Sequence, residues 1–408
     1  MISTVKRLLK YIFYQPLVLF LTLLVYLLRP FVLIRFLPIV THRIGHFVGN
    51  VEMYFCERDA GMHPKNSLDL VFYAGRNSCN KQLNVMWERV LKGYKLIHPP
   101  VLFSGILMRT QSYISKIPSM AVHIVKNSDS DDSRILRLQK VHLAFTDDEE
   151  RKGREALKSF GLPDNAEFVC IFARDNAYLS TLFPKGNWGY HDYRDADIRN
   201  YMDAAVEMTR RGYYVFRMGA VMKTPLPKLN NPMIIDLPFS DKRNDFIDIY
   251  LWMKCRFCIA SSAGPAVIPL VLRKPTVFVN WLPLPYITHW NDDNLFIPKR
   301  LFIRRLNRDA SFLEQNLFEA LSVNIGWRNS SEYYDTGLEF VENTPREILD
   351  VAIEMDDRLK GVHVTGQEDE RLQAQFWGMI TSLDETQVLG RKFRVGSKYL
   401  TDHRGRLG

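Results

Sequence analysis

Arginines, serines and glycines follow three apolar segments of the chain, at positions where they could bind a diphosphate. Apart from Glu167 and Arg256, which begin two of them, segments 167–173, 213–216 and 256–260 have the apolar composition of buried strands. The polar residues at their ends are Arg174, Asp175, Arg217, Gly219, Ser261, Ser262 and Gly264. Arginine binds phosphate through two parallel hydrogen bonds, and glycine lets the backbone approach an anion closely. Since ligands of a parallel α/β sheet bind beyond the carboxyl ends of its strands, the sequence predicts an anion site there.

A helix is predicted to begin beside the two serines. Pro265 suits the first turn of a helix, and segment 266–274 follows it with helical composition, so free N–H groups would face the anion. Arg243 and Asp245 start a further predicted helix just upstream of strand 256–260 and could face the same crevice. Helix capping alone would explain Asp245, and an arginine at a strand end commonly forms a surface ion pair.

A second group of candidate residues lies in "THRIGHFVGNVEMYF", residues 41–55. His46 is a candidate general base because histidine titrates near neutral pH, and Arg43 stands three residues before it. A structural histidine is the alternative. His191 and Asp192, in "WGYHDYRD", are rival acid–base candidates.

The elements that would position these residues alternate between strands and helices beyond residue 161. Apolar strands separated by helices of ten to fifteen residues indicate βαβ units and a parallel sheet. A capping box at Thr146 and Glu149 begins a helix that looks like a domain boundary. We therefore expect four regions: a hydrophobic membrane-associated segment (1–40), an α/β domain (41–160), a second α/β domain (161–340) and a helical region (341–408).

The N-terminal segment is strongly apolar. Residues 11–28, "YIFYQPLVLFLTLLVYLL", contain no charge and are just long enough to span a bilayer. Basic residues flank both ends, and Pro16 and Pro30 would bend the segment. We expect a shallow or re-entrant membrane helix, with a single span and a buried core helix as alternatives.

Composition limits the cofactors and partners. The formal charge of +9 favours an anionic partner such as nucleic acid, acidic lipid or a phosphorylated substrate. Five cysteines are too few for a disulfide framework, so Cys255 and Cys258 are expected to be buried thiols in a reducing compartment. No G-x-G-x-x-G follows a strand, which argues against a dinucleotide cofactor, and the two D-x-D sequences are poor candidates for a metal site.

The order of these segments resembles a family of bacterial glycosyltransferases associated with surface-polysaccharide synthesis. The matching pieces are "RIGHFVGNVEMYF", "NKQLNVMWERVL", "FARDNAYL", "YHDYRDADIRNY", "GYYVFRMGA", the segment 243–281 and "RVGSKYL". More distantly, the segment 243–281 is similar to the donor site of fucosyltransferases and heptosyltransferases. The resemblance implies the GT-B fold, with two Rossmann-like domains facing a cleft, and metal-independent sugar transfer. It implies that the donor diphosphate is bound by Arg174, Arg217, Ser261, Ser262 and Gly264.

The resemblance also assigns the acceptor side. It implies that the RIGH loop faces the acceptor with His46 as base, and we take Arg43 and Asp175 as further catalytic candidates. The predicted protein is a glycosyltransferase at the cytoplasmic face of a bacterial inner membrane, moving sugar from a nucleotide-sugar to a glycan or lipid-linked acceptor. The nucleotide-sugar is a substrate, no cofactor is needed, and nucleic acid is not a partner. A nucleotide-sugar epimerase of the same fold and a non-catalytic membrane scaffold are the alternatives.

Overall fold

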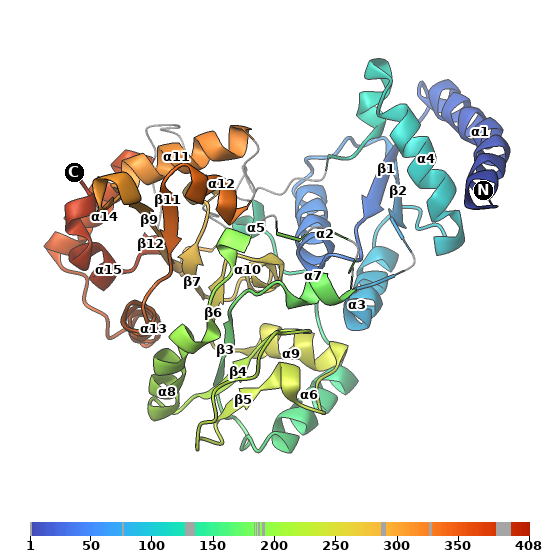
Figure 1. Cartoon of the computed structure of the whole chain (residues 1–408). Coiled ribbons are helices and arrows are strands. Elements are labelled where there is room, and N and C mark those ends of the chain that lie inside the picture. Colours follow the sequence, from blue (N-terminus) through green and yellow to red (C-terminus); the bar gives the residue numbers. More distant parts are fainter. Residues whose placement is uncertain are drawn as a thin grey trace. The chain divides into compact units, whose positions relative to one another are not determined.

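A computed structural model of the chain contains two compact units, residues 1–145 and 146–408 (Figure 1). The structure describes residues 2–75, 77–126, 135–182, 184, 186, 188–189, 192–286, 291–325, 329–380 and 393–408. The division falls before helix α6 (Asp147–Ser159), whereas the sequence placed that helix in the first domain. The reason is packing: Gly153 lies so close to the Tyr250 ring that an added Cβ would stand 2.0 Å from Tyr250 Cε2.

The first unit is built on two parallel strands, β1 (Leu33–Ile39) and β2 (Ser67–Tyr73). Single parallel bridges from Phe36 to Ile124 and from Leu70 to Ile97 extend the sheet on both sides. A buried ion pair crosses the two strands, because Arg35 donates from Nε and Nη2 to both carboxylate oxygens of Asp69 at 2.7 Å. Residues 33–39 were expected in the membrane-associated segment, so the structure corrects that boundary.

Helices surround this sheet. Their bounds are α1 (Ile2–Leu28), α2 (Ile44–Asp59), α3 (Lys81–Lys92), α4 (Ser104–Ile114) and α5 (Ile135–Leu138), with 3₁₀ turns η1 (Val101–Phe103) and η2 (Pro118–His123). Helix α1 packs against α4 through Val18 and Val25, which join a core with Ile106 and Leu107. No helix among the described residues is long and apolar enough to cross a membrane.

The second unit contains the predicted parallel sheet, which is thereby confirmed. Its order is β12-β8-β7-β6-β3-β4-β5, and every pairing is parallel. The strands are β3 (Phe168–Phe172), β4 (Tyr214–Arg217), β5 (Ile234–Asp236), β6 (Cys258–Ser261), β7 (Thr276–Trp281), β8 (Leu295–Pro298) and β12 (Arg394–Val395). The chain runs outward from β3 to β5 and returns to β6 on the other side of β3. The direction of winding therefore reverses between β3 and β6.

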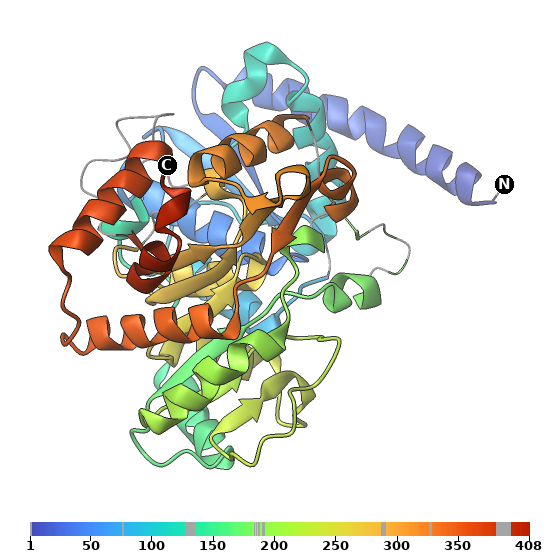
Figure 2. The same cartoon turned by 60° about the vertical axis from the view of Figure 1, so that its left-hand side comes forward.

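Helices cover both faces of this sheet. Helix α8 (Met202–Arg210) packs with α13 (Pro345–Leu359), and Figure 2 shows the two side by side. Helix α9 (Asp245–Lys254) packs with α6 and α10 (Val267–Val271). Right-handed crossovers place α8 and α9 on opposite faces, because the chain moves in opposite directions after β3 and after β5. The other helices are α7 (Ala177–Leu182), α11 (Phe312–Ile325), α12 (Ser330–Asp335), α14 (Gln367–Ile380) and α15 (Ser397–Asp402).

An antiparallel sheet of β10 (Arg308–Asp309), β9 (Arg300–Ile303) and β11 (Leu338–Val341) precedes the region 341–408, which the sequence predicted to be helical. That region contains the helices α13, α14 and α15 and the short strand β12. It also joins the main sheet, since β12 pairs with β8 and α13 packs on α8. Residues 341–408 are therefore part of the second unit.

Candidate active site

The carboxyl ends of β3 and β6 meet where the winding of the sheet reverses. The Arg174 N–H, just after β3, donates to Ser261 Oγ, the last residue of β6, at 2.7 Å. Through this bond the Ser261 hydroxyl joins the two strand ends, and Ser261 is fully buried. A reversal point of this kind is where open parallel sheets bind ligands. We call the carboxyl ends of β3 and β6 the switch-point site.

Ser262 links this site to a loop that the sequence had not singled out. Its hydroxyl donates to the Leu282 carbonyl at 2.8 Å. Arg194 Nη2 donates to the Ser262 carbonyl at 2.8 Å and to its Oγ at 3.0 Å. Both predicted serines therefore fix the backbone, and an arginine occupies the position next to Ser262.

Arg194 is a candidate site residue that the sequence did not predict. Its Nε is buried without a hydrogen-bond partner, and burial lowers the pKa of its guanidinium below the usual value. In the described part of the chain Arg194 forms no ion pair, whereas the nearby Arg199 pairs with Asp197 at 2.5 Å. The "YHDYRD" loop, considered only for His191 and Asp192, was the available signal.

The loop around Arg194 is held in place from two sides. Arg174 forms an ion pair with Asp195. Lys299, directly after β8, donates from Nζ to the Tyr193 carbonyl at 3.0 Å and to the Asp195 carbonyl at 2.5 Å. Burial lowers the pKa of Lys299 to about 8, so a cation that can lose its proton near neutrality lies beneath the site.

Arg217 has other partners in this structure. Its side chain is 1 % exposed and donates to the Thr224 carbonyl at 2.7 Å and to Asp236 Oδ1 at 3.3 Å. These bonds fix the loop after β4 to β5. A contact between Arg217 and a diphosphate would require exchanging those partners, and it stays a prediction.

The loop after β4 also explains Gly219 and Asp175. Gly219 has φ +143°, and a Cβ there would stand 2.5 Å from Met222 Sδ, so only glycine fits. Asp175 accepts from the Ala177 N–H at 3.0 Å and from the Lys223 N–H at 2.9 Å. Asp175 therefore joins the loops after β3 and β4, and its catalytic role stays a prediction.

The helix expected at residues 266–274 is much shorter in the structure. Gly264–Ala266 form a 3₁₀ turn, and α10 ends at Val271 because Arg273 takes a left-handed conformation with φ +54°. Gly264 lies at the predicted turn. The dipole of five helical residues contributes little, so an anion at the predicted site would have to be bound by side chains.

Arg243 and Asp245 lie at the start of α9. Asn244 caps this helix by accepting from the Ile247 N–H at 3.0 Å, so Asp245 is the first helical residue rather than the cap. Arg243 pairs with Asp248 at 2.6 Å, and burial raises the pKa of Asp248 to about 7 despite that pair. A contact of Arg243 and Asp245 with a donor stays a prediction.

In the first unit, the RIGH sequence forms the start of α2 directly after β1. Arg43 occupies the N-cap position, and His46 lies in the first helical turn. His46 and Asn50 line a recess of about 10 Å³ next to β1, close to the volume that one water needs. Of the rival acid–base pair, His191 is outside the described residues, and Asp192 accepts from the Ser330 hydroxyl at 2.8 Å.

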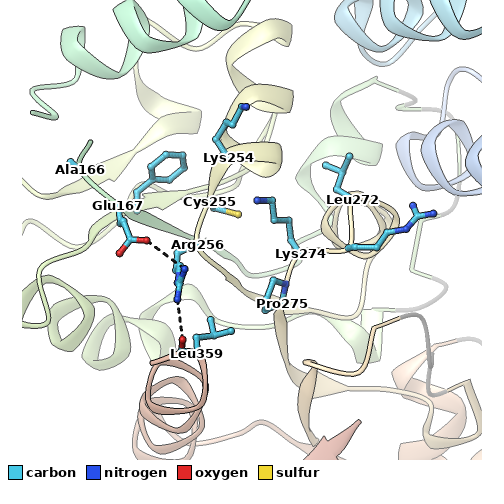
Figure 3. Close-up of a pocket in the computed structure, with 11 residues that line it drawn as sticks. Ala166, Glu167, Lys254, Cys255, Arg256, Leu272, Lys274, Pro275 and Leu359 are labelled. Carbon is cyan, nitrogen blue, oxygen red and sulfur yellow. Dashed lines mark hydrogen bonds and ion pairs between the residues drawn. The ribbon is translucent and has the colours of Figure 1, made fainter. Parts of the chain in front are cut away.

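A larger pocket, of about 440 Å³, opens at the end of the main sheet where its strands begin. Figure 3 shows it at the amino ends of β3, β6 and β7, where Arg256 contacts Glu167 and the Leu359 carbonyl. Open parallel sheets bind ligands at the carboxyl ends of their strands, so this pocket at the amino ends is not the candidate active site. Beside this pocket, Cys255 Sγ lies 3.3 Å from Cys258 Sγ. Both thiols are buried and neither forms a disulfide, as the sequence predicted.

Solved structures similar to this chain include enzymes that act on sugars. A glycosyl transferase of family 9 from Veillonella parvula is 10% identical, with 79% of this chain and 97% of that chain covered and a TM-score of 0.43. The E. coli ADP-heptose lipopolysaccharide heptosyltransferase II is 12% identical, with 65% and 90% covered and a TM-score of 0.37. The UDP-GlcNAc 2-epimerase of Neisseria meningitidis is 13% identical, with 80% and 100% covered and a TM-score of 0.26. No family model and no curated protein matches the chain.

Proposed function

We propose that this protein is a glycosyltransferase that binds a nucleotide-sugar donor at the switch-point site. The observation that carries the proposal is Arg194, which is fixed on Ser262 and has no carboxylate partner among the described residues. Desolvating a cation without a counter-ion is costly, so an anionic ligand would stabilise it. A diphosphate suits this position because a guanidinium binds phosphate oxygens with two hydrogen bonds.

The proposed chemistry uses this charge in the transition state. In transfer, the bond between the anomeric carbon and the diphosphate oxygen breaks, and negative charge grows on the leaving group. Arg194 would stabilise that charge from a position already fixed by hydrogen bonds to Ser262, and the Arg174 guanidinium could join it only by leaving Asp195. The acceptor oxygen forms the new bond and gives its proton to a base, for which we propose His46.

The GT-B class is part of this proposal. Its support is the presence of two α/β units, each with parallel strands, together with the sequence resemblance to polysaccharide-associated glycosyltransferases. In the first unit, His46 lies where a strand passes into a helix, the usual place for a ligand-binding residue. The acceptor we propose is a glycan or a lipid-linked sugar of the cell surface.

A ligand panel tests the donor site. Nucleoside diphosphates and nucleotide-sugars are added to the full chain, and a true donor raises the melting temperature by mass action. Arg194→Gln is expected to abolish the rise, whereas Arg199→Gln, an exposed arginine paired with Asp197, keeps it. No rise with any compound, or an equal rise in Arg194→Gln, contradicts the proposal. An epimerase would convert the bound sugar without an acceptor, which product analysis separates from transfer.

We also propose that the first unit lies on an acidic membrane surface through α1. One side of α1 packs on α4, and the residues on its other side are exposed and apolar: Leu17, Leu19, Phe20, Leu23, Leu24, Tyr26 and Leu27. Phe31, just after the helix, is 82 % exposed. The first acidic residue of the chain is Glu52, so this region is purely basic and complements acidic lipid. An interfacial helix combines these two properties.

A further inference from the structure

We infer that Glu52, Cys56 and His142 form a binding site for a divalent transition metal, with zinc the best match. Glu52 and Cys56 lie one turn apart on the same side of α2. His142 comes from the segment after α5, a helix that packs on α2. Their ligand atoms all lie within 4.8 Å of one another. Among the described residues, these three form the one group of His, Cys, Asp or Glu side chains that could hold a metal ion. The inference does not depend on the proposed function.

The spacing of the three side chains fits a tetrahedral ion. His142 Nδ1 lies 3.2 Å from Glu52 Oε2, and Cys56 Sγ lies 3.7 Å from Glu52 Oε1. Zinc bound to nitrogen or oxygen at about 2.0–2.1 Å and to sulfur at about 2.3 Å places tetrahedral ligands about 3.3–3.6 Å apart. The two separations that involve Glu52 therefore match this spacing to within a few tenths of an ångström, and the Cys56 and His142 ligand atoms lie within 4.8 Å of each other.

His142 supplies a separate observation that points to a ligand. Its side chain is 9 % exposed, and Nδ1 is buried without a hydrogen-bond partner although Glu52 is close. A short distance between His142 Nδ1 and Glu52 Oε2 without hydrogen-bond geometry is expected when both atoms bind the same ion. The other ring nitrogen, Nε2, lies 3.1 Å from Asp59 Oδ2. A carboxylate on the second nitrogen is the arrangement that orients most metal-binding histidines.

The donor set and its burial select the metal. Glu52 and Cys56 are both 0 % exposed, so the ion would be enclosed by protein. A thiolate, an imidazole and a carboxylate favour zinc or a similar transition metal, whereas magnesium and calcium require oxygen ligands. The competing account is an imidazolium between Glu52 and Asp59 without any ion. That account explains the thiol by its hydrogen bond to Glu52 Oε1, but it leaves His142 Nδ1 without a hydrogen-bond partner.

The metal would have a structural role. It would tie the segment around His142 to α2, the helix whose first turn carries His46. Zinc sites of this kind contribute directly to folding stability, because the unfolded chain lacks the assembled ligands. The resemblance implies that sugar transfer itself needs no metal. A structural metal at this site would not take part in that chemical step.

The test measures metal content and spectroscopy on the full chain. Purification without chelator is expected to give about one zinc per chain by elemental analysis, and Cys56→Ser and His142→Gln to give much less. Cys79→Ser, a cysteine of the same unit outside the cluster, is the matched control. After removal of the native metal, cobalt(II) should produce a thiolate-to-cobalt charge-transfer band in the wild type and in Cys79→Ser, but not in Cys56→Ser.

The wild-type chain alone can overturn the inference, even if the variants fail to fold. Zinc added to metal-free protein should raise its melting temperature. Absence of bound metal, of a thiolate–cobalt band and of any zinc-induced stabilisation would leave the imidazolium account. Nucleotide binding to the second unit is measured on the same samples, so failure of the metal site and failure of the donor site are distinguishable.

Discussion

The Arg174 N–H donates to Ser261 Oγ at 2.7 Å, and this bond joins the two strand ends between which the winding of the sheet reverses. The same turn continues to Ser262, which accepts from Arg194. The donor site that we propose therefore rests on a buried hydroxyl rather than on a helix terminus, because α10 is only five residues long.

Ser261→Ala should weaken both folding and donor binding. The Arg174 N–H would lose its acceptor, and an unsatisfied buried donor costs about 1–3 kcal/mol. Denaturant unfolding of the second unit measures the stability loss, and titration with the donor identified by the ligand panel measures affinity. Ser159→Ala, which removes an exposed hydroxyl bonded to Ala156, should change neither. Unchanged stability in Ser261→Ala would show that the bond is unimportant.

Lys299 should make donor affinity depend on pH. Burial lowers the pKa of its amine to about 8, so the cation beneath the site is present at pH 7 and mostly neutral at pH 9. Affinity for a nucleoside diphosphate should fall roughly threefold to tenfold over that range, as expected for charges in a partly buried site. The diphosphate itself stays ionised throughout, since the second pKa of a phosphate group is about 6.

Lys299→Met provides the comparison for this effect. The variant should bind the nucleotide weakly at pH 7 and show little change up to pH 9. The pH dependence of stability is opposite to that of affinity, because stability rises as the pH rises. The unfolded chain keeps the Lys299 proton up to about pH 10.5, whereas the folded chain loses it near pH 8. The contribution to folding therefore becomes more favourable between these pH values. A wild-type affinity that is flat from pH 7 to 9 contradicts the prediction.

Local sequence was enough to predict the main sheet and its strand ends. The apolar runs ending at Arg174, Arg217 and Ser261 become β3, β4 and β6, because strands covered on both faces need apolar side chains throughout. The capping box at Thr146 is also present. These features depend on residues close together in the chain, so pattern alone identifies them.

Contacts between distant residues account for what the sequence did not predict. The position of Arg194 depends on Lys299, which holds its loop from more than a hundred residues away. The partners of Arg217 come from β5 and its loop, which the pattern of β4 does not contain. His142 joins Glu52 only because α5 folds onto α2. Side chains of these types are ambiguous until tertiary packing selects their partners.

Removing the buried carboxylate of Asp69 should destabilise the first unit strongly. Asp69 accepts from Arg35, from Tyr54 at 2.6 Å and from Arg58 at 2.8 Å, and it is fully buried. Asp69→Asn leaves buried positive charge uncompensated, which costs about 3–5 kcal/mol. Denaturant unfolding of the full chain should show an earlier transition for the first unit alone.

The double variant Arg35→Met, Asp69→Leu should recover part of that loss. Replacing a buried ion pair by apolar residues of similar volume is often neutral. Lys65→Met, which removes an exposed charge just before β2, is the control and should change stability little. A first transition in Asp69→Asn that coincides with the wild type would contradict the importance of the pair.

The exposed side of α1 should bind vesicles that contain acidic lipid. Phe20 and Leu27 are each 58 % exposed, so Phe20→Glu with Leu27→Glu should abolish binding without disturbing the core beneath. Sedimentation with vesicles of phosphatidylcholine and phosphatidylglycerol measures it, and salt should weaken it. Met62→Glu, an exposed apolar residue after α2, is the matched control. Equal sedimentation of the double variant and the wild type would exclude this surface.

His46→Gln should remove turnover and leave donor binding intact. A general base typically contributes about 10²–10⁴-fold to the rate, and glutamine keeps hydrogen bonding without accepting the proton. His42→Gln, four residues earlier at an exposed position, is the matched control and should retain activity. If both variants keep wild-type kcat, the base lies elsewhere and the RIGH sequence serves the structure of α2. If His46→Gln instead loses nucleotide affinity with unchanged kcat, His46 acts in binding rather than in proton transfer.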